Sequence, residues 1–176
     1  MSKQLLIGIS GLMRSGKDTM ADRIAATVPN TTILHFADPL YQVMNLVQEF
    51  LYLPHEKDRL FLQMIGTGWG RAKDPNIWIN MLDRTIDSEL SKGNNVVIPD
   101  ARFLNEFEFL KNKGFTLVHV SRLEEFRVAA GASNMDHASE QDCKVYTGFD
   151  YTIYNNSSQQ HYYDTIDSYI KTLLSN

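Results

Sequence analysis

The segment Gly11-Leu12-Met13-Arg14-Ser15-Gly16-Lys17-Asp18-Thr19 decides the fold of this chain of 176 residues. It follows the short apolar run Leu5 to Ile9 and precedes the stretch Met20 to Val28, whose apolar residues recur at helical spacing. Glycine, four residues, glycine and lysine between a strand and a helix form the pattern of a phosphate-binding loop. The glycines let successive N–H groups point at an anion, and the helix N-terminus adds partial positive charge. The pattern therefore predicts a strand, loop and helix that bind a nucleoside triphosphate.

Seven positions of this segment are candidates to bind ATP. They are Gly11, Arg14, Ser15, Gly16, Lys17, Asp18 and Thr19. Lys17 should reach the outer phosphates, which also makes it a candidate catalytic residue. Asp18 replaces the hydroxyl residue that usually follows this lysine, so we expect Thr19 to face the Mg²⁺ that accompanies ATP, with Asp18 or a water as the alternatives. The competing interpretation of the segment is an ordinary glycine-rich turn with a surface lysine.

Strands and helices alternate along the rest of the chain. Further strands are expected over Thr31 to Phe36, Asn95 to Pro99, Phe115 to Val120 and Thr152 to Tyr154. Helices are expected from Asp38 to about Leu53, Lys57 to Ile65, Asn76 to Leu90, Glu106 to Lys113 and Tyr163 to Leu173. This alternation, with largely apolar strands, predicts an α/β fold in which helices cover both faces of a mostly parallel sheet. Ligands of such a sheet bind beyond the carboxyl ends of its strands.

The composition limits the function. Seventeen basic and 21 acidic side chains give a formal net charge of −4, which argues against a protein that coats DNA or RNA. A small anionic substrate is compatible with this charge, because a few arginines in one cleft can hold phosphates. No apolar run approaches the roughly 20 residues that cross a bilayer, so we expect no membrane span. Cys143 is the single cysteine, which leaves no intramolecular disulfide and favours a reducing cytoplasm. We expect one continuous domain over residues 1–176.

A helical insertion over about 39–92 is expected to bind the phosphoryl acceptor. Within it, the segment Gln63 to Arg71 combines an amide, a hydroxyl, an indole and a guanidinium on a glycine-rich backbone. The guanidinium of Arg71 could hold a monophosphate through two parallel hydrogen bonds. Trp69 or Trp78 could stack on a base, although packing in the core is an equal alternative for each tryptophan.

Charged side chains follow two of the expected strands. Asp100 comes just past the third strand, where enzymes with phosphate-binding loops often keep an acid that orients magnesium. Arg102 and Glu106 can reach the same cleft, and a surface ion pair is their competing interpretation. Asp38 has the corresponding place after the second strand, where it either meets the acceptor or caps a helix. We therefore expect magnesium at Thr19 and Asp100, and we expect the acceptor to contact Asp38, Gln63, Arg71, Trp78, Arg102 and Glu106.

The segment over about 122–142 is expected to form a helical lid. Arg122 and Arg127 bracket a short polar stretch, and Gly131 begins a break of small residues. Arginines on a closing segment would neutralise charge as the phosphoryl group passes between oxygens, and closure would exclude water. We therefore count both arginines with Lys17 as candidate catalytic residues. A solvated charged helix is the competing interpretation.

Four ordered motifs resemble those of the deoxynucleoside monophosphate kinases of bacteriophages, within the wider group of P-loop nucleoside monophosphate kinases. The motifs are Gly11 to Thr19, Gln63 to Arg71 with Trp78, Asp100 to Glu106, and Asp136 to Glu140. The resemblance covers most of the chain. It implies a P-loop three-layer α/β/α sandwich with a mostly parallel central sheet and a helical lid. It also implies a homodimer, and a location in the host cytoplasm if a phage encodes the chain.

The resemblance implies transfer of the γ-phosphoryl group from ATP, with Mg²⁺, to a deoxynucleoside monophosphate. Lys17 and the loop amides would hold ATP, and Arg71 and Arg102 would hold the acceptor. Two other classes stay open: a kinase of another small phosphorylated acceptor, of the phosphomevalonate or dephospho-coenzyme A type, and a non-catalytic regulatory module that binds ATP. A small GTPase is disfavoured, because Asn112-Lys113-Gly114-Phe115 lacks the carboxylate that pairs with guanine.

Overall fold

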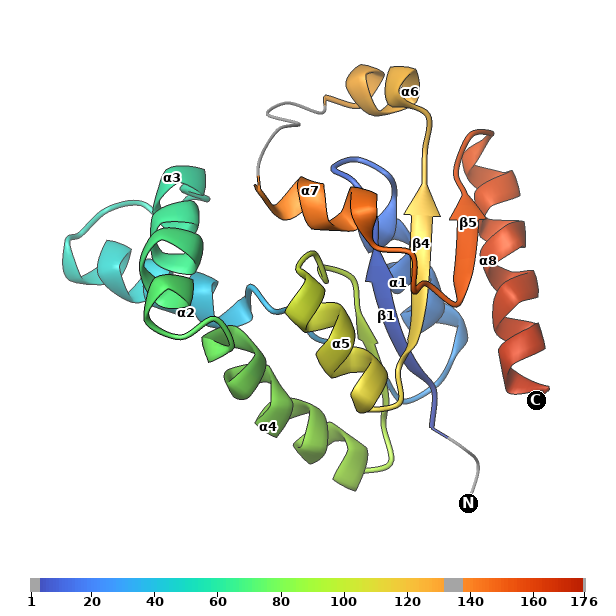
Figure 1. The fold of residues 1–176 in the computed structure, drawn as a ribbon, viewed down its shortest axis with the longest axis horizontal. Helices are drawn as coiled ribbons and strands as arrows, with labels where there is room; N and C mark the ends of the chain where they lie inside the picture. Colours follow the sequence, from blue (N-terminus) through green and yellow to red (C-terminus); the bar gives the residue numbers. More distant parts are fainter. Residues whose placement is uncertain (1–3, 132–137, 176) are drawn as a thin grey trace.

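A five-stranded parallel sheet lies at the centre of the protein (Figure 1). The structure, a computed structural model, describes residues 4–131 and 138–175. The strands are β1 (Leu6–Ser10), β2 (Thr31–Ile33), β3 (Asn95–Ile98), β4 (Thr116–Ser121) and β5 (Tyr151–Tyr154). Their order is β2-β3-β1-β4-β5, and each neighbouring pair is parallel. The predicted α/β fold is confirmed, with a sheet that is parallel throughout the described strands.

The first strand lies in the middle of this sheet. Gly8 of β1 pairs with Ile98 of β3 on one side and with Leu117 of β4 on the other. Because the strands are parallel, the segments that follow β1, β3 and β4 all leave the sheet at one edge. Open sheets of this kind bind ligands at that edge, next to the strand from which the connections diverge.

Helices cover both faces of the sheet, which confirms the three-layer sandwich. On one face lie α1 (Lys17–Thr27) and α8 (Gln159–Leu174), and on the other lie α4 (Ile77–Ser91) and α5 (Leu104–Asn112). Alternate residues of β1 meet the two layers, since Ile7 and Ile9 pack with α1 and α8, whereas Gly8 faces α5. A Cβ atom on Gly8 would lie 2.8 Å from Cδ1 of Leu110. The absence of a side chain there lets α5 lie close to the strand.

The chain between β2 and β3 is helical, as predicted. It forms α2 (Asp38–Phe50), α3 (Arg59–Gln63), the π-helix η1 (Met64–Arg71) and α4. Figure 1 shows α2 and α3 beside the sheet, on the side opposite α8. They form an arm that projects from the three layers.

The structure differs from the prediction in the glycine-rich stretch of η1, where a loop was expected after Ile65. A Cβ atom on Gly66 would lie 3.1 Å from Leu40, and one on Gly70 would lie 2.4 Å from the Trp78 ring. The two glycines therefore let Leu40 and Trp78 pack directly on the helix backbone. The packing of Leu40 at Gly66 and of Trp78 at Gly70 stabilises the π-helix. Short π-helices are frequent at functional sites.

Two short helices, α6 (Glu124–Ala129) and α7 (Ala138–Val145), follow β4. Figure 1 shows α6 beyond the carboxyl end of β4. The next helix is attached to the core, since Sγ of Cys143 lies 3.3 Å from Oγ of Ser10, and Asp142 accepts a hydrogen bond from the Leu104 N–H (3.1 Å). The first two residues of the Asp136 to Glu140 motif lie outside the described residues.

One face of α8 is buried. Tyr162, Ile166 and Ile170 recur every four residues along it and pack on the sheet. The rest of the helix carries polar side chains. Within residues 4–131 and 138–175, no helix has both the length and the apolar character that a membrane crossing requires.

Replacing Ile166 with alanine should lower the free energy of unfolding by about 3 kcal/mol, because the fully buried side chain would leave a cavity between α8 and the sheet. Leu174→Ala, at the exposed end of the same helix, should change it by less than about 0.5 kcal/mol. Urea denaturation of the wild type and both variants measures these differences. Equal losses for the two variants would contradict the packing of α8 on the sheet.

Candidate active site

The segment after β1 folds into a tight loop before the N-terminus of α1. Gly11, Arg14 and Gly16 have positive φ angles of 151°, 62° and 107°, a region that residues other than glycine rarely adopt. A Cβ atom on Gly11 would lie 2.4 Å from the Val120 carbonyl oxygen, and one on Gly16 would lie 2.5 Å from Nδ2 of Asn155. Both positions therefore require glycine, for the backbone angle and for space.

Positive charge gathers where this loop enters α1. Lys17 is buried, and its Nζ donates a hydrogen bond across the loop to the Leu12 carbonyl oxygen (3.0 Å). Asp18 is exposed in the first turn of the helix, where its charge complements the positive end of the helix dipole. Thr19 is half-buried in the same turn. The ammonium group and the helix N-terminus together suit a phosphate group.

Several buried donors in the loop and in the segment after β4 lack hydrogen-bond partners among the described residues. They are Oγ of Ser15, Nε of Arg122, and Nε and Nη1 of Arg127. Arg127 is only 6% exposed, and Arg122 reaches the loop, where its Nη1 donates to the Arg14 carbonyl oxygen (3.2 Å). A buried donor without a partner costs about 1–3 kcal/mol, and more when it is charged. These donors therefore fit the oxygens of a bound phosphate chain.

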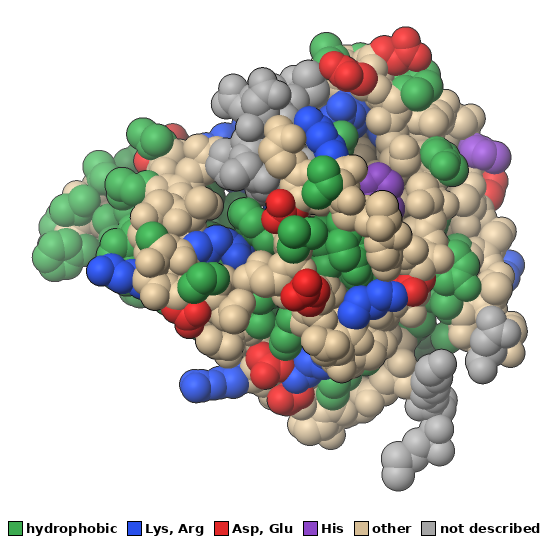
Figure 2. Space-filling model, viewed as in Figure 1, with side chains coloured by type: hydrophobic (Ala, Val, Ile, Leu, Met, Phe, Trp, Pro, Cys, Tyr) green, Lys and Arg blue, Asp and Glu red, His purple; other side chains and the backbone are tan. Residues whose placement is uncertain are grey.

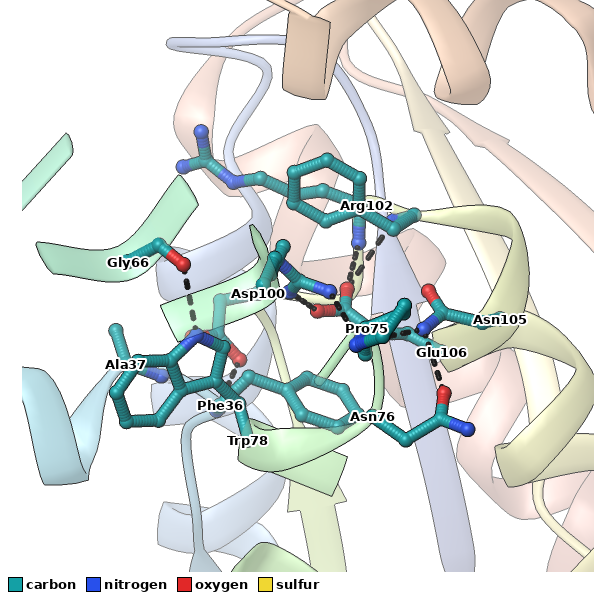
Figure 3. A network of polar contacts seen from close by, with 12 residues as sticks. Phe36, Ala37, Gly66, Pro75, Asn76, Trp78, Asp100, Arg102, Asn105 and Glu106 are labelled. Carbon is teal, nitrogen blue, oxygen red and sulfur yellow. Dashed lines mark hydrogen bonds and ion pairs between the residues drawn. The ribbon is translucent and has the colours of Figure 1, made fainter. Parts of the chain in front are cut away.

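Asp100 ties the end of β3 to the chain that leaves β2 (Figure 3). Its two carboxylate oxygens accept hydrogen bonds from the N–H groups of Phe36 and Ala37, each at 3.0 Å. Because these amides bind a side chain instead of a neighbouring strand, β2 ends at Ile33 and not at Phe36 as predicted. Burial raises the pKa of the Asp100 carboxyl.

The two residues predicted to face magnesium, Thr19 and Asp100, follow β1 and β3 and so lie at one edge of the sheet. Each carboxylate oxygen of Asp100 binds one backbone N–H and keeps a lone pair for a water or an ion. Across the described parts of the chain, no group of three or more His, Cys, Asp or Glu side chains could hold a metal. Because Mg²⁺ often takes only one or two protein oxygens when phosphates supply others, these residues fit an ion that arrives with ATP.

Asp38 lies in the first turn of α2, and its interpretation as a helix cap is wrong. Ala37 has the cap position. Oδ2 of Asp38 instead accepts a hydrogen bond from the His35 N–H (2.9 Å), and Oδ1 lies 3.5 Å from Nδ1 of the same histidine. Asp38 therefore fixes the turn before α2, and about half of its side chain stays accessible.

Glu106 is a buried carboxylate that holds three groups (Figure 3). It accepts hydrogen bonds from the backbone N–H groups of Arg102 (2.7 Å) and Phe103 (3.1 Å), and it forms an ion pair with Arg71. The Arg71 guanidinium also lies over the Phe103 ring, 3.9 Å from its centroid. Burial raises the pKa of Glu106, and the charge of Arg71 opposes that rise. Glu106 was predicted to contact the acceptor; in the structure its carboxylate positions Arg71 and the backbone before α5.

Arg102 is joined to Glu106 through its backbone, and not as the surface ion pair considered above. Figure 3 shows the side chain of Arg102 extending away from Glu106. The side chain is half-buried. The Arg102 guanidinium therefore does not share the Glu106 carboxylate with Arg71.

The tryptophans of the acceptor segment have different environments. Trp78 is 4% exposed, and its indole N–H donates to the Gly66 carbonyl oxygen (2.9 Å). Its predicted contact with the acceptor is therefore corrected to a packing role beneath η1. Trp69 is 53% exposed and is the accessible indole of this segment. Gln63 is exposed at the end of α3, and no hydrogen bond or ion pair in the described part of the chain joins it to the other predicted site residues.

A cavity of about 340 Å³ lies beside the stacked Arg71 and Phe103. Its wall includes Arg71, Pro75, Asn76, Phe103, Asn105 and Asp142. Nδ2 of Asn105 donates hydrogen bonds to the Pro75 carbonyl oxygen and to Oδ1 of Asn76, each at 2.9 Å. The cavity thus combines an aromatic ring, a guanidinium, side-chain amides and the carboxylate of Asp142.

Sequence reasoning missed two residues that contact the loop. Nδ2 of Asn155 donates to the Ser15 carbonyl oxygen (2.9 Å), and the hydroxyl of Tyr162 donates to the Gly16 carbonyl oxygen (3.0 Å). Asn155 follows β5 in a stretch that reads as a polar turn, and Tyr162 lies just before the helix predicted from Tyr163 to Leu173. No local pattern marks either residue, because each lies 140 or more positions from its partner.

Comparisons with known proteins agree with this geometry. The model of the family described as deoxynucleotide monophosphate kinase matches residues 55–166. An uncharacterized protein, ORF77, of Ictalurid herpesvirus 1 (strain Auburn) is 32% identical over 141 residues, which are 78% of this chain. The chain spans 58% of the length of that viral relative.

Solved structures resemble the chain over nearly its whole length. A sugar kinase from Janibacter sp. HTCC2649 has a TM-score of 0.58 at 14% identity, covering 96% of this chain and 95% of its own. TT1252 from Thermus thermophilus has a TM-score of 0.58 at 19% identity, covering 98% and 97%. Shikimate kinase from Bacteroides thetaiotaomicron has a TM-score of 0.53 at 13% identity, covering 96% and 98%. These likenesses show that the α/β fold of the chain is shared with known kinases.

Replacing Glu106 with glutamine should lower the free energy of unfolding by about 3 kcal/mol, because it leaves Arg71 without its buried counter-charge. Glu108→Gln, at an exposed position of the same helix, is the matched control and should change it by less than about 0.5 kcal/mol. Urea denaturation provides the comparison. If both variants were as stable as the wild type, Glu106 would not hold the acceptor side together.

Proposed function

The chain belongs to the deoxynucleotide monophosphate kinase family, and we propose that it transfers the γ-phosphoryl group of ATP to a deoxynucleoside monophosphate. The products are ADP and a deoxynucleoside diphosphate. The observation that carries the proposal is the set of buried donor atoms on Ser15, Arg122 and Arg127 that have no hydrogen-bond partner among residues 4–131 and 138–175. Donors of this kind suit the oxygens of a phosphate chain at the moment when charge moves between them.

The ATP side of the proposed site is the loop from Gly11 to Thr19. Its backbone amides and the N-terminus of α1 would bind the β- and γ-phosphates. The ammonium group of Lys17, which donates to the Leu12 carbonyl oxygen in this structure, would donate to the phosphate oxygens when ATP binds. Thr19 and Asp100 would hold Mg²⁺, which when bound neutralises charge on the ATP phosphates.

The transfer itself is a displacement at phosphorus. An oxygen of the acceptor monophosphate forms a bond to the γ-phosphorus, and the bond from that phosphorus to the β–γ bridging oxygen breaks, so that ADP leaves. The enzyme contributes position and charge. Arg122 and Arg127, from the segment proposed as the lid (residues 122–142), would offset the repulsion between the two anionic substrates.

The acceptor side would be supplied by residues 39–92 together with the start of α5. Arg102 and Arg71 are the proposed phosphate ligands. Arg71 has one face on Phe103 and one nitrogen on Glu106, so it would present its remaining N–H groups in a fixed direction. Trp69 and the neighbouring cavity of about 340 Å³ offer aromatic and amide surfaces to a nucleoside.

The proposed activity is tested by incubating the protein with ATP, Mg²⁺ and a panel of single acceptors, then separating the products by chromatography. The panel contains the four deoxynucleoside monophosphates, their ribose counterparts, phosphomevalonate and dephospho-coenzyme A. We expect ADP and a deoxynucleoside diphosphate in equal amounts. Phosphorylation of phosphomevalonate or dephospho-coenzyme A alone, or no dependence of ADP release on any acceptor, would contradict the proposal.

Replacing Lys17 with methionine should lower kcat by about 100-fold or more, since the variant loses a cation that meets the transferring phosphates. The thermal unfolding curve should stay close to that of the wild type. Lys92→Met removes an exposed lysine that pairs with Glu89 at the far end of α4 and should leave the rate unchanged. Wild-type activity in Lys17→Met would contradict the assignment of the loop.

We also propose that the protein forms a homodimer through the arm. An apolar stripe on α2 faces solvent, with spacing typical of a helix that packs against another. The α2 stripe consists of Val43, Leu46, Val47 and Phe50. Phe50 is 83% exposed, and Tyr52 in the following turn is 96% exposed. Figure 2 shows hydrophobic side chains gathered at the outer end of the arm.

A second copy of the chain suits this surface better than a charged partner. The stretch from Leu40 to Pro54 contains one charged residue, Glu49, so two stripes related by a two-fold axis can meet with little repulsion. Phe50 and Tyr52 together would remove roughly 300–500 Å² from water on each chain. With the neighbouring aliphatic side chains, the area approaches the roughly 800 Å² per partner of a stable interface.

Replacing Phe50 with glutamate should convert the dimer to a monomer, because it places a charge at the centre of the apolar contact. Light scattering during size-exclusion chromatography measures the mass. Leu174→Glu, at an exposed apolar position far from the arm, should stay dimeric. A wild-type mass of 20.1 kDa, or a dimeric Phe50→Glu variant, would contradict this interface.

A further inference from the structure

Three successive carbonyl groups of the phosphate-binding loop are held by side chains from outside it. Nη1 of Arg122 donates to the Arg14 carbonyl oxygen (3.2 Å). Nδ2 of Asn155 donates to that of Ser15 (2.9 Å), and the hydroxyl of Tyr162 donates to that of Gly16 (3.0 Å). The last two donors come from the C-terminal part of the chain, after β5 and on α8. Asn155 and Tyr162 together form a loop clamp.

The loop clamp fixes the direction of the amides that follow each carbonyl. In a trans peptide unit, the C=O and the N–H of the next residue point in opposite directions. A Ser15 carbonyl held toward Asn155 therefore turns the Gly16 N–H away from Asn155. The Gly16 carbonyl accepts the Met20 N–H of α1 (3.0 Å) as well as the Tyr162 hydroxyl, and together these bonds hold the Lys17 N–H directed away from Tyr162. These two N–H groups lie at the N-terminus of α1, where a phosphate chain would bind.

The fit between the loop clamp and Gly16 is close. A Cβ atom at this position would lie 2.5 Å from Nδ2 of Asn155 and 3.3 Å from the Tyr162 ring. Glycine is therefore required here for the approach of the clamp as well as for the positive φ angle of 107°. Arg14, two residues before Gly16, is not a glycine and also has a positive φ angle (62°), a conformation that costs free energy and that outside contacts help to hold.

The environment of Tyr162 suits a permanent donor. The side chain is buried among the residues of α1 and the sheet, with its hydroxyl at the loop. Burial raises the pKa of the phenol above its usual value. The hydroxyl therefore keeps its proton at neutral pH and can donate to the Gly16 carbonyl oxygen.

We propose that Asn155 and Tyr162 are positioning residues that hold the loop amides in the phosphate-binding direction. The inference rests on the proposed function only in that a nucleotide phosphate binds at this loop. It makes the affinity for phosphate depend on the docking of α8, an element that contributes no residue to the predicted site.

The test measures the binding of two probes by titration calorimetry: ADP, and inorganic tripolyphosphate, which lacks a base. Tyr162→Phe removes the hydroxyl and keeps the ring, and Asn155→Ala removes the other donor. We expect each variant to bind both probes about five- to tenfold more weakly, the value of one hydrogen bond. Tyr163→Phe is the matched control, because that hydroxyl accepts a hydrogen bond from Gln159 and not from the loop; it should bind like the wild type.

The outcomes separate this inference from the proposed function. If the wild type binds neither probe, the proposed function itself is overturned. Wild-type affinity in Tyr162→Phe would overturn the loop clamp alone, and so would weaker binding of ADP with unchanged binding of tripolyphosphate, which would indicate a contact with the base. Thermal unfolding, together with the ¹H–¹⁵N shifts of the Gly16 and Lys17 amides, shows whether a variant is folded and whether the two amides have moved as expected.

Discussion

The turn at the start of α1 is the feature on which the proposed site depends: its carbonyl groups bind side chains from outside the loop, which directs its N–H groups the other way. The Gly16 carbonyl also accepts the Met20 N–H of α1 (3.0 Å), so Tyr162 is its second donor. Here Arg122, Asn155 and Tyr162 each bind one of those carbonyls. They come from the ends of β4 and β5 and from α8, so one side of the sheet supports the loop that the central strand presents.

On the other side of β1, two buried carboxylates hold backbone N–H groups. Asp100 binds the two amides that follow β2, and Glu106 binds the two amides before α5 and the Arg71 side chain. The two carboxylates therefore hold backbone N–H groups in place, and Glu106 also holds the guanidinium of Arg71. Glu106 therefore fixes both proposed phosphate ligands. It binds the side chain of Arg71 and the backbone N–H of Arg102.

Local signals in the sequence predicted most of the fold. The glycine spacing from Gly11 to Gly16 and the alternation of apolar runs gave the correct strand, loop and helix and a parallel sheet. The π-helix was missed because its stability comes from Leu40 and Trp78 packing on glycines. The low helix propensity of glycine predicts a loop for the stretch from Gly66 to Gly70. The contact between Tyr162 and Gly16 joins residues 146 positions apart, and only the packing of α8 on the sheet brings them together.

We propose that the loop from Gly11 to Thr19 binds the phosphates of ATP and faces the phosphate of a second nucleotide. The most direct measurement is a crystal structure with ADP and a deoxynucleoside monophosphate bound. We expect β-phosphate oxygens within hydrogen-bond distance of the Gly16 and Lys17 N–H groups, and the monophosphate between Arg102 and the loop. An empty loop with ADP bound elsewhere, or a monophosphate directed away from the β-phosphate, would contradict the account.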